Sequence, residues 1–278
     1  MVNVKNTFDV GFEPSRVNPR SQKNAGTRWQ GPAADVTHVF GTVLGNTQAR
    51  EYSWLRCEEV PRWKRVLDVT LVLMTALLWG PLFLMVAAMI KIVSRGPILF
   101  RQERVGFQGN RFTCLKFRSM KVGADTGVHK DYLKGLMSSD APMVKMDLKG
   151  DARLIPFGSL LRCTGLDELP QLINVLRGDM SLVGPRPCIP YEYEDYLPWQ
   201  KARCDTLPGL TGLWQVSGKN RTSFNEMINL DIAYVNHKSP WLDVKIILGT
   251  IPAIVTQVLE TRNARKAQPL VVLGTRQV

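Results

Sequence analysis

The sequence predicts an α+β, mainly helical fold with two parts: a re-entrant membrane helix-break-helix and a small domain on the cytoplasmic side of the membrane. Three observations predict it. The run from Val69 to Ile90 carries no charge and exceeds the roughly 20 residues that cross a bilayer as a helix. Short apolar segments separated by glycines over residues 95–125 indicate a short β hairpin. Apolar periodicity farther along the chain indicates several helices.

The membrane segment is the dominant physical feature. Its centre contains Gly80 and Pro81, and proline removes a backbone donor and clashes with the preceding turn, so we expect the membrane helix to break there. Basic residues flank the run on both sides: Arg56, Arg62, Lys64 and Arg65 before it, and Lys91, Arg95, Arg101 and Arg104 after it. Because basic flanks prefer the cytoplasm, a segment that enters and leaves by that face satisfies both flanks. A full span is the alternative, and a buried helix of a soluble protein is a further one.

Four regions follow from this pattern. Residues 1–60 are polar, without sustained periodicity, and are expected to form a flexible extension. Residues 61–95 form the re-entrant segment, residues 96–260 the cytoplasmic domain, and residues 261–278 a basic C-terminal tail. We expect no cleavable signal peptide, because the first apolar run starts after residue 60.

Within the domain, we expect strands over 98–100 and 112–117, joined by a turn over 106–110. We expect helices in the following segments: 124–137, 156–162, 169–177 and 223–237. Residues 240–259 are mostly apolar, but Asp243 and Lys245 lie near one end and Pro252 lies inside. This pattern favours an amphipathic helix in the membrane interface over a second span.

Composition limits the classes of partner. The 278 residues have a formal net charge of +12, which favours an anionic partner such as nucleic acid, an acidic membrane face or a phosphorylated substrate. The five cysteines are widely spaced without a CxxC pair, which argues against a disulfide framework and against a structural zinc site. Charge alone does not choose among the three kinds of anion.

The adjacent acids Asp167 and Glu168 are the densest candidate for chemistry. Pro170 follows them, so they fall at or near a helix N-terminus, where they also fit a plain helix cap. Arginines lie nearby in the sequence, namely Arg153, Arg162, Arg177 and Arg186. Cations close to paired acids suit a phosphorylated substrate, with a divalent cation, best Mg²⁺, bridging acids and phosphates. In that scheme Asp167 is the nucleophile and Glu168 holds the metal.

Other candidate substrate-binding residues lie outside this pair. Lys116 and Arg118 alternate along a predicted strand and should share a face, although a solvated edge strand explains them equally well. Arg186 lies between Pro185 and Pro187, which stiffen the loop that presents it. The remaining candidates mix an amide, cations and an acid: Gln215, Lys219, Arg221 and Asp231.

Taken together, several motifs resemble the bacterial sugar transferase family of monotopic polyprenyl-phosphate phosphoglycosyl transferases. The resemblance covers roughly residues 62–256. Its motifs, in chain order, are the run 64–97, the segment 104–120, Leu166-Asp167-Glu168-Leu169-Pro170-Gln171, the segment 178–187 and Pro208-Gly209-Leu210-Thr211-Gly212. Two departures stand out: Gly165 replaces a common serine, and Lys219 stands where the family often has arginine, a role that Arg221 could take.

The resemblance implies transfer of a sugar 1-phosphate from a UDP-sugar to polyprenyl (undecaprenyl) phosphate, with release of UMP, as the first membrane step of exopolysaccharide or other glycan assembly. It implies a re-entrant helix, Mg²⁺, a location at the bacterial inner membrane with the catalytic domain in the cytoplasm, and an aspartyl sugar-phosphate intermediate on Asp167. It gives nucleic acid no role and leaves a homo-oligomer open. A membrane-tethered nucleic-acid-binding or scaffold protein is the alternative function, but it gives the Asp167-Glu168 pair no use.

Overall fold

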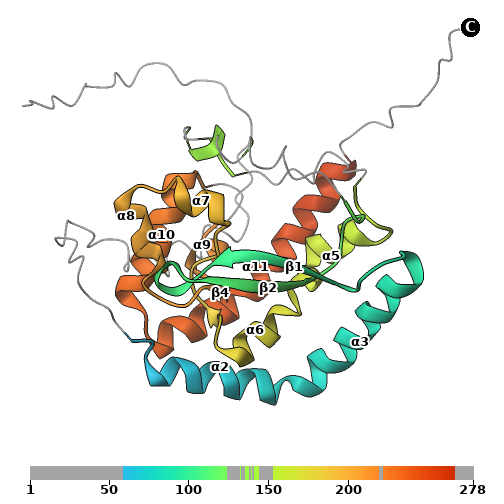
Figure 1. The fold of residues 1–278 in the computed structure, drawn as a ribbon, viewed down its shortest axis with the longest axis horizontal. Helices are drawn as coiled ribbons and strands as arrows, with labels where there is room; N and C mark the ends of the chain where they lie inside the picture. Colours follow the sequence, from blue (N-terminus) through green and yellow to red (C-terminus); the bar gives the residue numbers. More distant parts are fainter. Residues whose placement is uncertain are drawn as a thin grey trace, which may run out of the picture.

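The computed structural model describes residues 59–123, 132, 135–137, 139, 141–143, 153–218 and 222–266. The expected N-terminal extension lies almost entirely outside these residues, as does most of the expected helix over 124–137. The described part is mainly helical, with two small pairs of strands at its centre (Figure 1).

Two consecutive helices, α2 (Arg62–Met74) and α3 (Ala76–Val93), form the apolar segment. The break between them lies at Thr75, so the predicted break at Gly80 and Pro81 is wrong: α3 continues through Pro81. At Thr75 the backbone leaves the helical region, with φ −91° and ψ 3°. The indole N–H of Trp79 donates to the Val72 carbonyl at 2.9 Å, which supplies a side-chain donor at the break.

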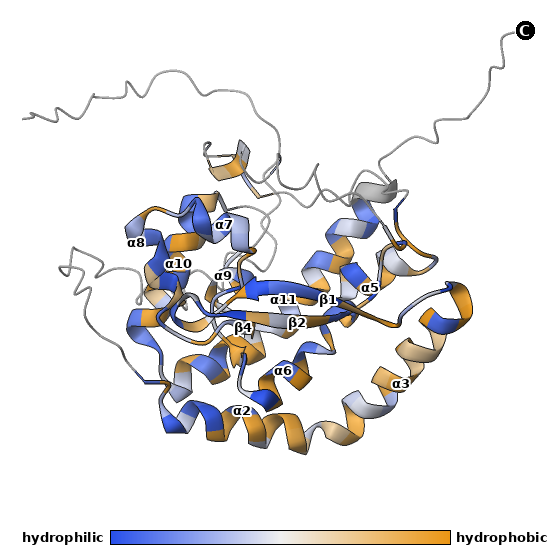
Figure 2. Cartoon of the chain, viewed as in Figure 1, coloured by the Kyte–Doolittle hydropathy of each residue, from blue (hydrophilic) through white to orange (hydrophobic). Residues whose placement is uncertain are grey.

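The two helices differ in what they bury. In α2 the buried residues are Lys64, Asp68 and Val72, spaced four apart on one face, and this face packs against α6 and β3. In α3 only Val86 and Ile90 are buried. Figure 2 shows apolar residues along the outer side of both helices. By length and composition α3 could cross a membrane, and so could residues Pro240–Asn263.

The predicted hairpin is confirmed. Strand β1 (Leu99–Val105) pairs antiparallel with β2 (Arg111–Phe117), with Leu99 opposite Phe117 and Val105 opposite Arg111. The first strand is longer than predicted. A short 3-10 turn, η1 (Phe107–Gly109), joins the strands and places Gly109 at φ 77°, where glycine has no steric penalty.

Three short helices follow in sequence: α5 (Gly158–Thr164), the 3-10 turn η3 (Leu166–Glu168) and α6 (Gln171–Arg177). They match the predicted helices over 156–162 and 169–177. Gly165, in a left-handed conformation with φ 75°, separates α5 from η3 and lets the chain turn sharply there.

A parallel pair of strands follows, which the sequence analysis did not predict. Strand β3 (Ser181–Val183) pairs with β4 (Gly209–Thr211), with Ser181 opposite Gly209. Between them lie α7 (Pro190–Glu194), α8 (Pro198–Lys201) and the 3-10 turn η4 (Ala202–Cys204). The chain passes very close at Gly184, where a Cβ atom would lie 2.3 Å from the Leu207 carbonyl oxygen.

The last three helices are α9 (Leu213–Val216), α10 (Phe224–His237) and α11 (Pro240–Lys266). Ser223 caps α10 by accepting from the Glu226 N–H. Helix α11 continues past residue 260, where we placed the end of the domain. It crosses behind the hairpin in Figure 1 and packs against α5, α9 and β3. Two hydrophobic clusters pack α10 against α9. One of them also includes residues of α7 and η4.

Candidate active site

A small pocket lies where the hairpin, the η3–α6 segment and the loop after β3 meet. Its lining combines three cations with one carboxylate, an amide, a thiol and a proline: Arg104, Lys116, Arg186, Glu168, Gln171, Cys114 and Pro187. Cations in such number around one carboxylate favour an anionic ligand with several charges, such as a diphosphate.

The turn η3 places Asp167 and Glu168 beside this pocket. The left-handed Gly165 lets its carbonyl accept from the Glu168 N–H at 3.0 Å, which closes the turn. Glu168 lines the pocket and its side chain is 32% exposed, whereas Asp167 is buried at 9% exposure. Glu168 therefore lies at the site, and Asp167, the residue before it in the same turn, is the less accessible of the two acids and is not among the residues that line the pocket.

Lys116 forms an ion pair with Glu168 at the pocket, a contact that the sequence analysis did not predict. Its ammonium lies 2.7 Å from the Glu168 carboxylate. The strand that carries Lys116 is joined to α6, the helix that follows Glu168, by Asn174, whose amide donates to the Thr113 carbonyl at 2.8 Å and accepts from the Leu115 N–H at 3.0 Å. The buried Asn174 thus fixes α6 against the open edge of β2 and sets the distance from lysine to glutamate.

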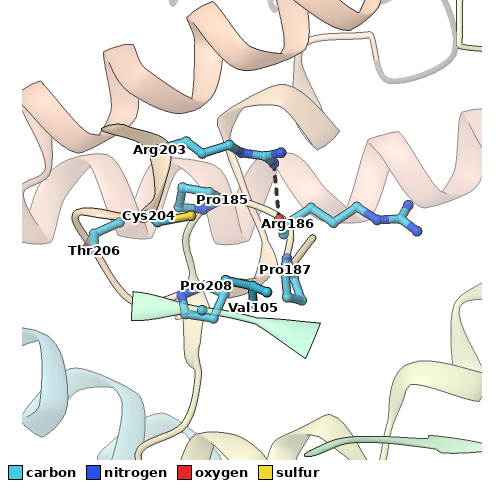
Figure 3. Close-up of a pocket in the computed structure, with 9 residues that line it drawn as sticks. Val105, Pro185, Arg186, Pro187, Arg203, Cys204, Thr206 and Pro208 are labelled. Carbon is cyan, nitrogen blue, oxygen red and sulfur yellow. Dashed lines mark hydrogen bonds between the residues drawn. The ribbon is translucent and has the colours of Figure 1, made fainter. Parts of the chain in front are cut away.

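Arg186 enters the pocket from the loop after β3. The prolines on both sides restrict its backbone, as the sequence indicated. Figure 3 shows that its side chain extends away from Cys204 and Thr206, which line a second small hollow behind the same loop. The dashed line there joins the Arg203 guanidinium to the Arg186 carbonyl, at 3.1 Å.

Two predicted substrate-binding residues have other roles. Arg118 follows the end of β2 and is buried, and its guanidinium donates to the carbonyls of Arg95 and Ser94 at the end of α3. It therefore stabilises the carboxyl end of that helix, and its guanidinium contacts main-chain carbonyls there. Asp231 is 1% exposed and pairs with Arg203 at 2.5 Å, which places it in a buried ion pair instead of against a substrate.

The other predicted residues lie around the site. Arg162 is in the last turn of α5, which packs against η3. Arg153 lies beside the bridge between Met120 and Leu154, and its carbonyl accepts from the Lys121 N–H. Gln215 donates to the Leu210 carbonyl at 3.3 Å. Lys219 and Arg221 lie outside the described residues.

Comparisons with known proteins agree with this geometry. A family model described as bacterial sugar transferase matches residues 60–257. The chain belongs to this family. The resemblance found in its motifs is thereby confirmed.

Several curated relatives cover about the same part of this sugar transferase. It is 43% identical over 192 residues to the galactosyl transferase CpsE of Streptococcus agalactiae, with 69% of this chain and 42% of that protein covered. It is 43% identical over 202 residues to the UDP-glucose:undecaprenyl-phosphate glucose-1-phosphate transferase of Caulobacter vibrioides, covering 69% and 70%. It is 38% identical over 191 residues to the exopolysaccharide production protein ExoY of Rhizobium meliloti, covering 69% and 84%. The chain thus spans most of ExoY but less than half of CpsE.

Sequence reasoning about this sugar transferase missed three residues at the site. Arg104 and Gln171 line the pocket, and Arg203 lies behind it. We had assigned Arg104 to the basic flank of the membrane segment. Strand alternation offered a signal, because it places Arg104 on the same face as Gln102, and the Gln102 amide oxygen accepts from Arg104 at 2.7 Å. Nothing in the sequence near Arg203 distinguishes it from a surface arginine.

The residues of the pocket fit a Mg²⁺ ion bound together with a phosphorylated substrate. Among the residues that the structure describes, no three His, Cys, Asp or Glu side chains gather into a complete metal site. Mg²⁺ does not need one, since it commonly binds one or two carboxylates and takes its other ligands from water and substrate phosphates. Glu168 and the adjacent Asp167 supply that number of carboxylates.

Proposed function

We propose that this sugar transferase moves a sugar 1-phosphate from a UDP-sugar to a polyprenyl phosphate and releases UMP. One observation carries the proposal: Glu168, which follows Asp167 in the turn η3, lines a pocket that also presents Arg104, Lys116 and Arg186. Cations of this kind bind a diphosphate. Transfer of the phosphate that bears the sugar also needs a nucleophile or a metal at the same place. The names of the Caulobacter and Salmonella relatives, both undecaprenyl-phosphate sugar-phosphate transferases, support it.

In the first step of the proposed reaction, a carboxylate oxygen of Asp167 attacks the phosphorus that bears the sugar. A bond forms between that oxygen and the phosphorus, and the phosphoanhydride bond to the uridine phosphate breaks. UMP leaves with the electron pair, and an aspartyl sugar-phosphate remains. Lys116 and Arg186 stabilise the negative charge on the phosphoryl oxygens and the leaving phosphate.

In the second step, a phosphate oxygen of the polyprenyl phosphate attacks the same phosphorus. The acyl-phosphate bond breaks, the Asp167 carboxylate is regenerated, and the product is a polyprenyl diphosphate sugar. Glu168, with Asp167, would hold Mg²⁺ when it is bound, and the ion would neutralise the phosphates and polarise their oxygens. Splitting the transfer in two lets a water-soluble donor and a lipid acceptor use one site in turn.

We further propose that the enzyme meets its lipid substrate by lying in the cytoplasmic face of the inner membrane. Leu77 and Leu78 of α3 are 88% and 76% exposed, which is costly in water and favourable in lipid. Helix α11 also has an exposed apolar stripe, formed by Trp241, Leu248, Ile251, Val255 and Leu259. These positions share one helical face, while the helix packs against α5, α9 and β3. A helix that is half covered by its own domain suits the interface better than a span.

The chemical proposal is tested by measuring UMP release from the full chain in nanodiscs with Mg²⁺. A panel of UDP-sugars is compared with and without polyprenyl phosphate. We expect a stoichiometric burst without acceptor, sustained turnover with acceptor, and loss of both in Asp167→Asn. Turnover that needs both substrates and shows no burst would replace the covalent route by direct transfer. Absence of UMP with every donor would overturn the proposed function.

The membrane arrangement is tested by labelling introduced cysteines in intact cells with a membrane-impermeant maleimide. Glu59→Cys and Ser94→Cys lie on the two sides of the α2–α3 segment. In a background with the native cysteines replaced, we expect neither to be labelled until the inner membrane is opened. Labelling of exactly one of them from outside would show a full span and contradict the re-entrant arrangement.

A further inference from the structure

The loop that carries Arg186 is anchored at its base by main-chain hydrogen bonds. The Gly184 N–H donates to the Thr211 carbonyl, and the Gly209 N–H donates to the Pro185 carbonyl, both at 2.8 Å. These bonds continue the β3–β4 pairing into the loop. Beyond Pro185 this ladder ends, and Pro187 has no N–H with which to extend it. On the far side of the loop the Val105 N–H donates to the Cys188 carbonyl at 2.9 Å. Between these main-chain contacts, the carbonyls of Arg186 and Pro187 are held by side chains.

Two arginines from different parts of the chain supply that support. Arg203 of η4 donates to the Arg186 carbonyl at 3.1 Å, as Figure 3 shows. Arg104 of β1 donates to the next carbonyl, that of Pro187, at 3.0 Å. Arg203 is 2% exposed and Arg104 is 6% exposed, so neither bond competes with bulk water.

Each of these guanidinium groups is itself held in place. Arg203 forms ion pairs with Asp231 at 2.5 Å and with Glu192 at 3.7 Å. It also donates to the Tyr196 hydroxyl. Counter-charges on both sides offset the cost of burying this cation and fix its orientation.

Arg104 is held differently. Its Nε and a terminal nitrogen donate to the Gln102 amide oxygen at 3.1 Å and 2.7 Å. Arg104 therefore donates to two uncharged oxygens, the amide oxygen of Gln102 and the carbonyl oxygen of Pro187. Arg104 also lines the pocket, so its charge adds to the positive field around Glu168. Burial, and next the nearby Arg186, lower its pKa.

We propose that Arg203 and Arg104 form a clamp on the carbonyls of Arg186 and Pro187, and that both are positioning residues for the Arg186 guanidinium in the donor pocket. The clamp fixes two successive peptide planes and hence the direction of the Arg186 side chain. Arg203 acts through Arg186, whereas Arg104 also contributes charge. The proposal rests on the proposed function, in which Arg186 binds the donor phosphates. Asp231 and Glu192 orient the clamp from behind.

The test is a double-mutant cycle between Arg203→Lys and Arg186→Ala. Lysine keeps the charge that pairs with Asp231 but cannot also reach Tyr196 and the Arg186 carbonyl with a planar fork. We expect Arg203→Lys alone to lower kcat/KM for the UDP-sugar about 10-fold or more, mainly through KM. In the Arg186→Ala background the same change should have almost no further effect, because the group that it positions is gone.

Arg111→Lys is the matched control. This arginine pairs with Glu103 and Glu194 at the surface, its side chain is 55% exposed, and its replacement should leave kcat/KM unchanged. An equal loss from Arg203→Lys in both backgrounds would show a general structural role and overturn the clamp. If Arg203→Lys does not fold, the cycle is run with Gln102→Leu, which loosens Arg104 at the other end of the clamp. Because Arg104 also contributes charge of its own, the clamp then predicts a smaller loss in the Arg186→Ala background than in the wild type, and equal losses overturn it.

The clamp and the proposed function are separated by a binding measurement. A fluorescent UDP-sugar is titrated into Asp167→Asn protein, in which binding does not depend on turnover. We expect the same non-additive pattern in Kd. Additive effects on Kd alongside normal UMP release by the wild-type protein would refute the clamp alone. Non-additive Kd values without any UMP release would support the clamp and reject the reaction.

Discussion

Lys116 brings a full positive charge to the one carboxylate that lines the pocket. Its ammonium is 2.7 Å from Glu168, and the side chains are 17% and 32% exposed. At such exposure an ion pair stabilises the fold only slightly. Its placement beside Arg104 and Arg186 is better explained by the needs of a phosphorylated substrate than by stability.

Replacing Lys116 with methionine tests this explanation. We expect kcat/KM for the UDP-sugar to fall roughly 10²-fold, because a preorganised charge at the transferred phosphate is removed. The thermal midpoint should change little, since the pair is partly solvated. UMP release and a melting curve measure the two effects. Near-normal turnover together with a large drop in the midpoint would assign the pair to the fold and not to catalysis.

Asp231 makes a prediction about pH. Burial raises its pKa to about 6, although Arg203 and, farther off, Arg186 lower it, and Glu192 adds to the rise. The unfolded value is about 3.9. Between these values the folded protein holds a proton that the unfolded chain has released, so the contribution of Asp231 to stability is largest below pH 4 and falls as pH rises to 6.

The measurement compares unfolding midpoints of the wild type and Asp231→Asn between pH 4.5 and 7.5. The stability of the wild type relative to the variant should fall up to about pH 6 and then stay level. Asparagine keeps the shape but cannot titrate, so the difference isolates this carboxyl. A relative stability that rises with pH would mean that attraction to Arg203 outweighs burial.

Among the elements, those with local signals were predicted and those with non-local partners were not. The hairpin was found because two apolar strands flank a glycine-containing turn, and α10 because its apolar residues recur with helical periodicity. Strands β3 and β4 have three residues each, and each is stable only beside the other, far along the chain. The break at Thr75 was missed because proline marks where a helix is weakened, while the packing of α2 on the domain decides where the helix bends.

Two glycine substitutions test these element boundaries. Gly184→Ala would place a Cβ atom 2.3 Å from the Leu207 carbonyl oxygen and 2.9 Å from the Gly209 nitrogen. Both are backbone atoms that cannot move alone, so we expect a loss of roughly 2 kcal/mol or more and weaker donor binding, since the Arg186 loop begins there. Denaturant unfolding in detergent measures the loss.

Gly80→Ala is the matched control. Apart from its chain neighbours and the nearby backbone of α3, no atom lies within 4 Å of a Cβ placed at Gly80, and α3 is continuous there. Alanine should therefore leave the helix intact and stabilise it by about 0.5–1 kcal/mol. A marked loss of stability and activity in Gly80→Ala would return the break to Gly80 and Pro81. Equal tolerance of both substitutions would contradict the close approach at Gly184.

At the scale of the whole molecule, buried charges join the apolar segment to the domain. The sequence analysis treated Lys64 as part of a basic flank on the cytoplasmic side, but Lys64 is fully buried and pairs with Asp243 of α11 at 2.7 Å. Arg65 donates to the carbonyls of Val175 and Leu176 at the end of α6. The first turns of α2 therefore belong to the domain.

The contacts of Lys64 form a closed group between three helices. The Tyr234 hydroxyl of α10 lies 2.8 Å from the Lys64 ammonium and 2.7 Å from the second oxygen of Asp243, and it also lies 3.2 Å from the Val183 carbonyl. Breaking one partner leaves an uncompensated charge in the interior, at a cost of about 3–5 kcal/mol. Replacing both partners by apolar groups of similar size removes that charge and should cost much less.

We therefore expect Lys64→Met and Asp243→Leu each to lower the free energy of unfolding strongly, and the double variant to lose clearly less than the sum. Denaturant unfolding in detergent gives the coupling, and Arg111→Met, at an exposed pair, should lose under about 1 kcal/mol. The double variant also distinguishes the attachment of α2 to the domain from the buried charge pair itself. It keeps α2 on the domain by apolar contact, so it should still release UMP at the membrane, whereas each single variant should lose membrane-bound activity in proportion to its instability. Additive losses would mean that Lys64 and Asp243 are stabilised by separate partners and do not tie α2 to α11.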